Sequence, residues 1–289
     1  MDLGLRYEVS RQTVSGDAVA ERELNYLKPS AALDWRASDN WRIQVSVKRT
    51  VAQLNFEDFI SVAELSNERI NGGNANIVPQ RSWEMLLTAQ RRLLSDGLLK
   101  IELGRDRISR LQDRVPTPEG FDAPGNLGAG DRLLARLQSD APLSRFGLKG
   151  GRLSGRFTYQ DTAVRDPYTL RKRRFSNTST WTSEVTLRQD LGKYAWGATA
   201  AWTSNDRTTF RRNELDRNYA GLSLKAFAEY RPSARTTLRL AVDNLADTRY
   251  GRERTFFAPD RRNPVASSTE LRARNIHLVP SLSLKHNFG

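Results

Sequence analysis

The sequence has 289 residues, a formal net charge of +13 and a mean hydropathy of −0.62. No stretch approaches the roughly 18 consecutive apolar residues of a membrane helix, and the chain contains no cysteine, which excludes disulfide bonds and thiolate metal sites. A transmembrane β-strand needs only about 10 residues, of which alternate ones face lipid, so these values still allow a membrane β-barrel.

The repeating pattern along the chain has a period of two residues, which indicates strands with two different faces. About twelve segments show it, at 2–11, 25–36, 40–50, 81–94, 97–107, 131–141, 150–161, 180–190, 193–204, 219–231, 235–246 and 277–288. One face of each is mainly apolar. Charged residues repeatedly occupy the other face, as at Arg136, Arg152, Arg156, Arg188, Arg239 and Lys285.

The connections between these segments alternate in length. Short ones lie at 37–40, 95–97, 190–193 and 231–235, and long ones near 51–79, 108–130, 162–179, 205–218 and 247–276. Short turns at one end and long loops at the other are typical of outer-membrane barrels, whereas a soluble β-sandwich usually has shorter strands. Tryptophan and tyrosine also gather near segment ends, as in interfacial girdles: Trp35, Trp41, Trp83, Trp181, Tyr194 and Tyr230. We therefore expect an all-β, antiparallel transmembrane β-barrel meander of about twelve strands, with its charged faces toward the lumen.

Three stretches carry a family resemblance. The first comprises Leu27–Trp35, Trp41–Arg49 and Leu54–Phe59. The second, Gly73–Glu84, is similar to the pattern G-N-x-x-L-x-P-E-x-S-x-x-x-E, with Ile77 for Leu and Gln80 for Glu. The third, Val242–Tyr250, is similar to N-L-F-D-x-x-Y, with Ala246 at the aromatic position. Their order along the chain resembles the later part of a TonB-dependent outer-membrane receptor.

The resemblance implies that residues 1–289 form the C-terminal portion of a receptor barrel, without a plug domain. Such a receptor has about 22 strands, so this chain is expected to supply a partial barrel. The implied function is energy-coupled uptake of a scarce nutrient across the outer membrane of a Gram-negative bacterium. The implied partners are the TonB complex, through the missing N-terminal region, together with outer-membrane lipid and lipopolysaccharide.

The end of the chain resembles the amphipathic last strand that the barrel assembly machinery reads. Leu282, Leu284 and Phe288 lie on its apolar face and are the residues expected to carry that assembly signal. Here Gly289 follows the terminal aromatic residue, and His286 stands where a more apolar residue is usual.

The long connections combine arginines with aromatic residues. Arginine forms charge-assisted hydrogen bonds with carboxylate and phosphate, so these side chains are candidates for contact with an anionic substrate such as a ferric siderophore, although haem and sugars also fit. Contact with lipopolysaccharide phosphates or plain exposure to solvent is the alternative interpretation. The candidates are Arg165, Tyr168, Arg171, Arg173, Arg174, Phe175, Phe210, Arg211, Arg212, Arg254, Phe256 and Phe257.

Catalytic chemistry is not indicated. With only His277 and His286 and no cysteine, a zinc site or a histidine-based triad is not expected, and no nucleotide-binding glycine pattern is present. We predict no cofactor and no metal. Two other classes stay open: a complete twelve-stranded porin, channel or outer-membrane enzyme, and a soluble basic nucleic-acid-binding β protein. The lysines and arginines are spread along the chain, which argues against nucleic acid.

Overall fold

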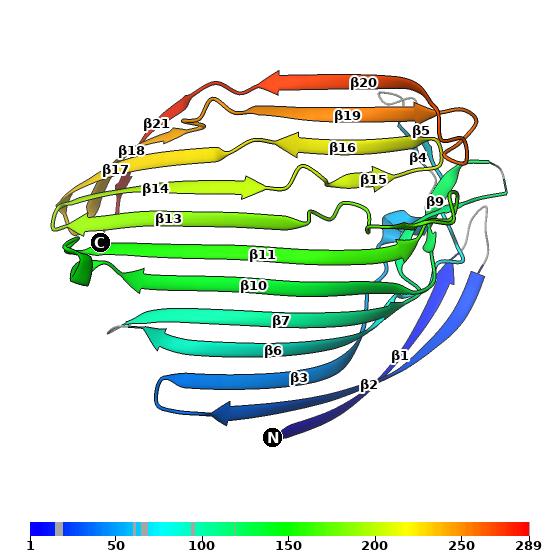
Figure 1. Cartoon of the computed structure of the whole chain (residues 1–289), viewed down its shortest axis with the longest axis horizontal. Helices are drawn as coiled ribbons and strands as arrows, with labels where there is room; N and C mark the ends of the chain where they lie inside the picture. Colours follow the sequence, from blue (N-terminus) through cyan, green and yellow to red (C-terminus); the bar gives the residue numbers. More distant parts are fainter. Residues whose placement is uncertain (15–19, 60–61, 65–68, 94–95, 119, 289) are drawn as a thin grey trace.

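The computed structural model describes residues 1–14, 20–59, 62–64, 69–93, 96–118 and 120–288. Its main feature is a curved antiparallel sheet in which twelve strands follow one another in chain order (Figure 1). They are β1 (Asp2–Val14), β2 (Ala20–Arg36), β3 (Trp41–Val51), β6 (Arg81–Leu93), β7 (Gly97–Ser109), β10 (Gly130–Pro142), β11 (Gly151–Arg165), β13 (Trp181–Leu191), β14 (Tyr194–Thr203), β17 (Ser223–Ser233), β18 (Thr236–Asp243) and β21 (Val279–His286). The described residues contain no helix long and apolar enough to span a membrane.

The predicted meander is confirmed, because each of the twelve expected segments coincides with one of these strands. Residue 94, where one segment was expected to end, and Gly289 lie outside the described residues. Within the described ranges the edge strands β1 and β21 each pair on one side only and not with each other. The sheet is therefore not closed, as expected of a partial barrel.

The short turns lie at one end of the sheet and the long connections at the other (Figure 1). A 3-10 turn, η3 (Ser144–Phe146), is part of a short connection. The long connections contain the 3-10 turn η1 (Phe56–Phe59), the pair β4 (Val62–Glu64) and β5 (Arg69–Asn71), the pair β8 (Gln112–Pro116) and β9 (Asp122–Asn126), and β12 (Lys172–Arg173). The last of these strands pairs with β11.

A second sheet continues the wall at the long-connection end. It consists of β15 (Thr208–Phe210), β16 (Glu214–Ala220), β19 (Arg249–Phe257) and β20 (Ala266–Asn275). The sequence predicted only connections at 205–218 and 247–276, so this sheet is a correction. Its inner positions carry charge instead of an apolar stripe: Arg252 pairs with Asp216 at 2.7 Å and Arg254 with Glu214 at 2.6 Å.

The two sheets are separated by an interruption that runs across four neighbouring strands, near residues 204–207, 221–222, 244–248 and 276–278. Asn244 has a positive φ of 56° and lies at its centre. The Asn244 Oδ1 accepts a hydrogen bond from the Thr248 amide at 2.9 Å, and its Nδ2 donates to the carbonyl of Ile276. The Thr248 hydroxyl donates to the carbonyl of Leu222. Side chains thus supplement the few remaining backbone hydrogen bonds here, such as that from the Leu245 amide to the Leu224 carbonyl at 2.8 Å.

The outer face of the main sheet is apolar and exposed. Alternate residues of neighbouring strands point to this face, so the apolar side chains form continuous rows. They include Leu87, Leu103, Leu133, Leu137, Phe157, Val185, Trp196 and Leu240. An exposed apolar band of this extent is what a lipid-facing surface requires.

The inner face carries paired charges. Arg132 donates to Asp106 at 2.6 Å, and Arg136 to Glu102 at 2.9 Å, in each case between the neighbouring strands β7 and β10. Nearer the short-turn end, Glu229 accepts from Arg188, Arg231 and Arg239 at 2.7 to 3.0 Å. Because each carboxylate is at most about a tenth exposed, these ion pairs compensate charges that water reaches poorly.

Phe227 is an aromatic residue on the charged inner face. Its ring lies between two guanidinium groups, 4.0 Å from that of Arg239 and 5.3 Å from that of Arg188. It covers Gly197, where an added Cβ would lie 2.7 Å from the ring and 2.6 Å from the carbonyl oxygen of Leu187. The glycine therefore makes room for a cation–π arrangement inside the wall.

Candidate functional site: the loop cap

The connections 110–129, 166–180, 204–213 and 258–265 pack together at the long-connection end, and we call them the loop cap. A small apolar cluster anchors the cap to the strands beneath it. Ile108, Leu111 and Val164 are buried in this cluster, and Phe175 packs against them. Phe175 was predicted to contact substrate, but it packs against this apolar cluster.

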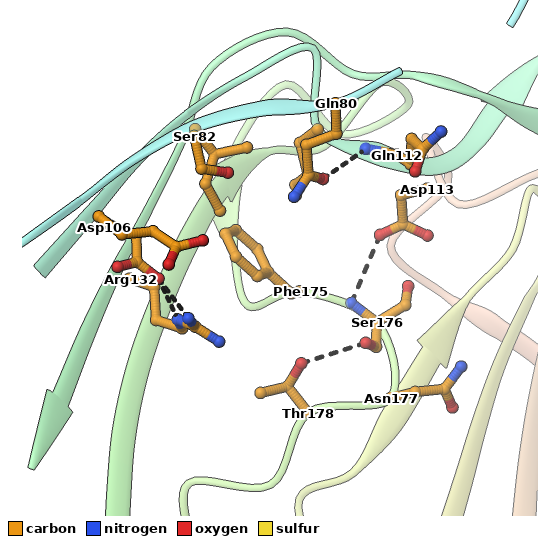
Figure 2. Close-up of a pocket in the computed structure, with 13 residues that line it drawn as sticks. Gln80, Ser82, Asp106, Gln112, Asp113, Arg132, Phe175, Ser176, Asn177 and Thr178 are labelled. Atoms are coloured by element: carbon orange, nitrogen blue, oxygen red, sulfur yellow. Dashed lines mark hydrogen bonds and ion pairs between the residues drawn. The ribbon is translucent and has the colours of Figure 1, made fainter. Parts of the chain in front are cut away.

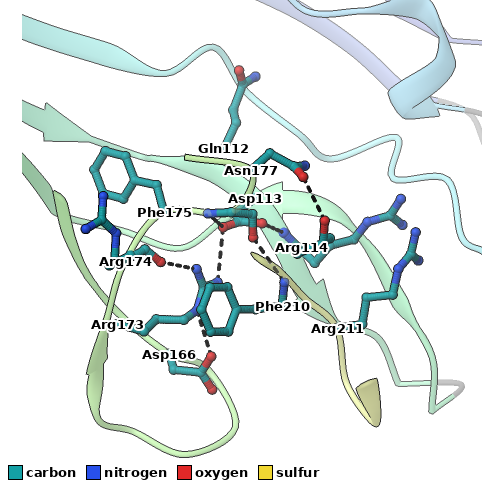
Figure 3. A network of polar contacts seen from close by, with 12 residues as sticks. Gln112, Asp113, Arg114, Asp166, Arg173, Arg174, Phe175, Asn177, Phe210 and Arg211 are labelled. Atoms are coloured by element: carbon teal, nitrogen blue, oxygen red, sulfur yellow. Dashed lines mark hydrogen bonds and ion pairs between the residues drawn. The ribbon is translucent and has the colours of Figure 1, made fainter. Parts of the chain in front are cut away.

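A buried ion network joins three of these connections (Figure 3). Arg173 binds Asp166 at 2.7 Å and Asp113 at 3.1 Å, and Arg261 binds the same Asp166 at 2.7 Å. All four side chains are at most 7 % exposed. The Phe210 ring lies 4.4 Å from the Arg173 guanidinium, so both charge and an aromatic face hold this arginine.

A second set of contacts links the network to the outer part of the cap. The Tyr168 hydroxyl donates to Asp122 at 2.6 Å, and the other oxygen of Asp122 accepts from the Arg212 amide at 2.7 Å. Burial and the bond to Asp122 raise the pKa of Tyr168, so the phenol stays protonated. Burial alone would raise the pKa of Asp166, but bonds from Arg261 and from the Thr169 and Tyr168 amides outweigh burial and lower it.

Above these contacts lies a small cleft of about 230 Å³, here called the loop cleft. Its lining combines cations with aromatic and proline rings: Pro116, Thr117, Gly120, Phe121, Pro167, Tyr168, Arg212, Asp260 and Arg262. Arg262 pairs with Asp260 at 2.6 Å, and this hydrogen bond holds the pKa of Asp260 at about 2. Of the residues that line the cleft, two are arginines and one is an acid, so the lining itself carries one net positive charge.

A larger cavity of about 390 Å³ opens beneath the cap on the inner face (Figure 2). Phe175 and residues 176–178 line it on one side, and Gln80, Gln112 and Asp113 also line it. Three carboxylates, those of Glu84, Asp106 and Asp113, face it together with one arginine, Arg132. An anionic ligand is therefore less well matched to this luminal cavity than to the loop cleft.

The structure brings only some of the predicted substrate contacts together. Tyr168 and Arg212 share the loop cleft. Arg173, Phe210 and Phe175 belong to the interior of the cap, and Arg174 binds the Gln160 carbonyl at 3.1 Å and Asp206 at 3.4 Å.

The remaining candidates are spread over the cap and the second sheet. Arg211 is half-buried, and its carbonyl accepts from Arg261. Arg254 is 6 % exposed and stacks at 4.7 Å on Phe256, with Phe257 half-buried beside it. Arg165 and Arg171 are exposed.

Sequence reasoning missed several residues that shape the cap. Asp122, Asp166 and Arg261 hold it together, and Phe121 and Arg262 line the cleft. A lone acid or arginine in a long connection carries no local signal, because its partner lies far away in the chain. The described residues contain no group of three or more acidic, histidine or cysteine side chains arranged to hold a metal ion.

Two of the motifs that suggested the family act as structural joints. In the second stretch Ile77 is 1 % exposed, and Asn74 donates to the Pro124 carbonyl at 2.9 Å, which ties this connection to β9. In the third stretch Asn244 and Thr248 bridge the interruption between the two sheets. These residues therefore position the cap.

An unclosed antiparallel meander with an apolar outer face, a charged inner face and long connections at one end defines the class: part of the wall of an outer-membrane-type β-barrel. Residues 1–245 match the family described as TonB dependent receptor-like, beta-barrel. The chain belongs to this family, whose members are transport receptors of the Gram-negative outer membrane and not enzymes. Family membership thus confirms the predicted resemblance and the prediction of a non-enzymatic protein.

Two solved receptors share the fold. The ferric-catecholate import receptor Fiu from E. coli K12 superposes with a TM-score of 0.60 at 13 % identity, over 99 % of this chain and 42 % of that receptor. The ferric enterobactin receptor PfeA from Pseudomonas aeruginosa, in complex with enterobactin, gives 0.57 at 15 % identity, over 78 % and 36 %. The chain thus spans about two fifths of the length of these receptors. No curated protein sequence matches the chain.

Proposed function

We propose that this chain is part of the wall and cap of an outer-membrane receptor that imports an anionic iron chelate, a ferric siderophore, into a Gram-negative bacterium. Family membership supports a receptor, and the two solved structures of the same fold are described as ferric-catecholate and ferric enterobactin receptors. The observation that carries the substrate class is the loop cleft, where the cation Arg212 lies beside the aromatic side chains Phe121 and Tyr168.

Energy for import comes from the TonB complex, which acts through a plug domain in the part of the receptor that precedes this chain. An outer membrane holds no ATP, so a receptor of this class needs such an external source. The outer membrane, its lipopolysaccharide and the barrel assembly machinery complete the proposed set of partners. Leu282 and Leu284, about 70 % exposed on the outer face of β21, remain the residues proposed to carry the assembly signal with Phe288.

The unclosed sheet favours this proposal over a complete twelve-stranded porin. β1 and β21 present unpaired backbone groups, which lipid does not tolerate. About ten further strands of a larger barrel would pair with both edges and remove the unpaired groups.

Within the cap we assign substrate contact to Arg212 and Tyr168, with Phe121 and Arg262 beside them, and to the exposed Arg171. Arg173 and Arg261 act as positioning residues, because the guanidinium groups of both are engaged in buried ion pairs with Asp166. Phe210, Arg211, Arg254, Phe256 and Phe257 stay candidates for the outer rim of the binding surface.

Uptake of a ferric tris-catecholate by cells carrying the full-length receptor tests the assignment. The variant Arg212→Ala is expected to raise the substrate concentration for half-maximal uptake about tenfold, because a charge-assisted hydrogen bond to the anion is lost. The matched control is Arg217→Ala, which removes an arginine that pairs with Glu253 at 2.7 Å on the second sheet. Unchanged uptake of ferric siderophore, haem and sugar alike, at normal surface levels of Arg212→Ala, would sink the assignment.

A further inference from the structure

Several cations on the inner face of the sheet are neutralised by acidic residues of the same sheet. On the inner face Arg132, Arg136 and Lys48 each pair with a carboxylate on a neighbouring strand. On the outer face, at the long-connection end, five cations have no ion-pair or hydrogen-bond partner among the described residues: Arg49, Arg105, Arg107, Arg165 and Lys172. We call this group the rim patch.

The strand register places the rim patch on one continuous surface. Arg49 lies opposite Trp83, and Trp83 lies opposite Arg107. Arg105 precedes Arg107 by two positions on the same face of β7, about 7 Å away. Arg165 lies on β11, which is two strands from β7 and roughly 10 Å across the sheet, two positions beyond the row of Arg107, and it faces Lys172 of β12. All are exposed except the half-buried Arg49.

The rim patch begins where the apolar band ends. Along the outer face of β7 the residues change from Ile101 and Leu103 to Arg105 and Arg107 within one alternation. Trp83, 42 % exposed on the adjacent strand, marks the same boundary, as aromatic residues do at a membrane interface. The cations therefore lie at the level of lipid headgroups, on the side of the long connections.

Two acids share this surface. Asp131 lies opposite Arg107, and Asp161 lies two strands from Arg105 in the same row. Both are exposed on the outer face, and neither has an ion-pair partner among the residues described. Five cations against two carboxylates leave a net positive rim, and arginine binds phosphate through two parallel hydrogen bonds.

We infer that the rim patch binds the phosphate groups of a lipid headgroup in the outer leaflet, that is, of a phosphorylated glycolipid such as lipopolysaccharide. The inference rests on the proposed placement of the chain in the outer membrane. It assigns Arg165 to lipid instead of substrate, because Arg165 points to the outer face, away from the loop cleft.

The test uses full-length receptor purified in detergent and titrated with lipid A that carries two phosphates. The double variant Arg105→Gln/Arg107→Gln is expected to retain about fivefold less lipid at a subsaturating concentration, since each exposed ion pair contributes modestly. Arg145→Gln, in η3 at the short-turn end, is the matched control and is expected to bind as the parent does. Equal retention by the double variant and the parent overturns the inference.

Two further measurements exclude simple damage and other ligands. Asp131→Asn removes a repulsive charge, so it is expected to increase lipid A retention, which a merely destabilised protein would not do. Dephosphorylated lipid A is expected to bind weakly, and inorganic phosphate is expected not to displace lipid A. Full binding of the dephosphorylated lipid, or displacement by inorganic phosphate, overturns the assignment to a lipid phosphate.

The result is separable from the proposed function. A receptor that fractionates with the outer membrane and imports ferric siderophore normally, but binds lipid A independently of Arg105 and Arg107, contradicts the rim patch alone. A chain that does not fractionate with the outer membrane contradicts the proposed placement first.

Discussion

The sheet and the loop cap both neutralise buried charge, but they do so over different distances along the chain. In the sheet, Arg132 meets Asp106 from the adjacent strand, 26 positions away. In the cap, Arg261 meets Asp166 across 95 positions, and Tyr168 meets Asp122 across 46. Pairing in the sheet therefore follows from the register of one hairpin. Pairing in the cap requires several connections to be in place together.

The largest effect is expected from removing a buried carboxylate of the cap, and the comparison is an exposed carboxylate in the short turn between β6 and β7. Asp166→Ala leaves Arg173 and Arg261 buried without their shared partner, so opening of the cap should become easier by about 3–5 kcal/mol. Asp96→Ala, whose partner Arg152 is 43 % exposed, should cost less than about 1 kcal/mol. Hydrogen exchange of segments 162–179 and 258–265 in the full-length receptor measures the first effect. Equal costs for the two variants would remove the distinction.

The two faces of the sheet provide the next comparison. Leu103→Arg places a charge in the lipid-facing band and should destabilise the folded barrel by about 2–4 kcal/mol. Gln44→Arg adds the same side chain to the exposed inner face of β3 and should be nearly neutral. Urea titration of the receptor in liposomes distinguishes them. Comparable losses would show that the inner and outer faces are assigned wrongly.

Two glycines of the main sheet differ in the room they leave for a Cβ atom, and so in the expected cost of a substitution by alanine. Gly197→Ala forces a methyl group against the Leu187 carbonyl and the Phe227 ring, so we expect a loss of about 1–3 kcal/mol. At Gly155 the nearest atom is the Ser139 hydroxyl at 3.2 Å, which can rotate away, so Gly155→Ala should cost less. The folded fraction of each variant by gel mobility is the readout, and the reverse order would contradict this account.

The smallest expected effect concerns acid pH. Asp260 has a pKa of about 2 in the folded cap, below its ordinary value of 3.8, so its bond to Arg262 contributes stability that is complete above pH 4. That contribution is lost as the pH falls through about 2. Protease susceptibility of segment 258–265 should therefore rise between pH 4 and pH 2. At pH 5 the variant Asp260→Asn should be cleaved by protease faster than the parent protein, and its cleavage rate should depend less on pH.

The twelve strands of the wall were predictable because every second residue of a membrane strand faces lipid and is therefore usually apolar. Leu103 and Leu133 obey it, and the register follows from the short turns. The second sheet was missed because charged residues such as Arg252 and Arg254 occupy its inner positions, so its strands lack a regular alternation of apolar and polar residues. The role of Arg173 was also not predictable. Its partner Asp113 lies in another connection, and its partner Asp166 belongs to no motif that would mark it as an ion-pair partner.

The interruption around Asn244 makes the upper part of the wall a separate mechanical element. Within the main sheet a backbone ladder joins neighbouring strands along their length, but across residues 244–248 the side chains of Asn244 and Thr248 make several of the hydrogen bonds. The second sheet is therefore joined to the main sheet by a different kind of contact from the one that holds neighbouring strands of the main sheet together. The apolar rows of the outer face belong to the main sheet, whose strand register does not depend on the side chains of Asn244 and Thr248.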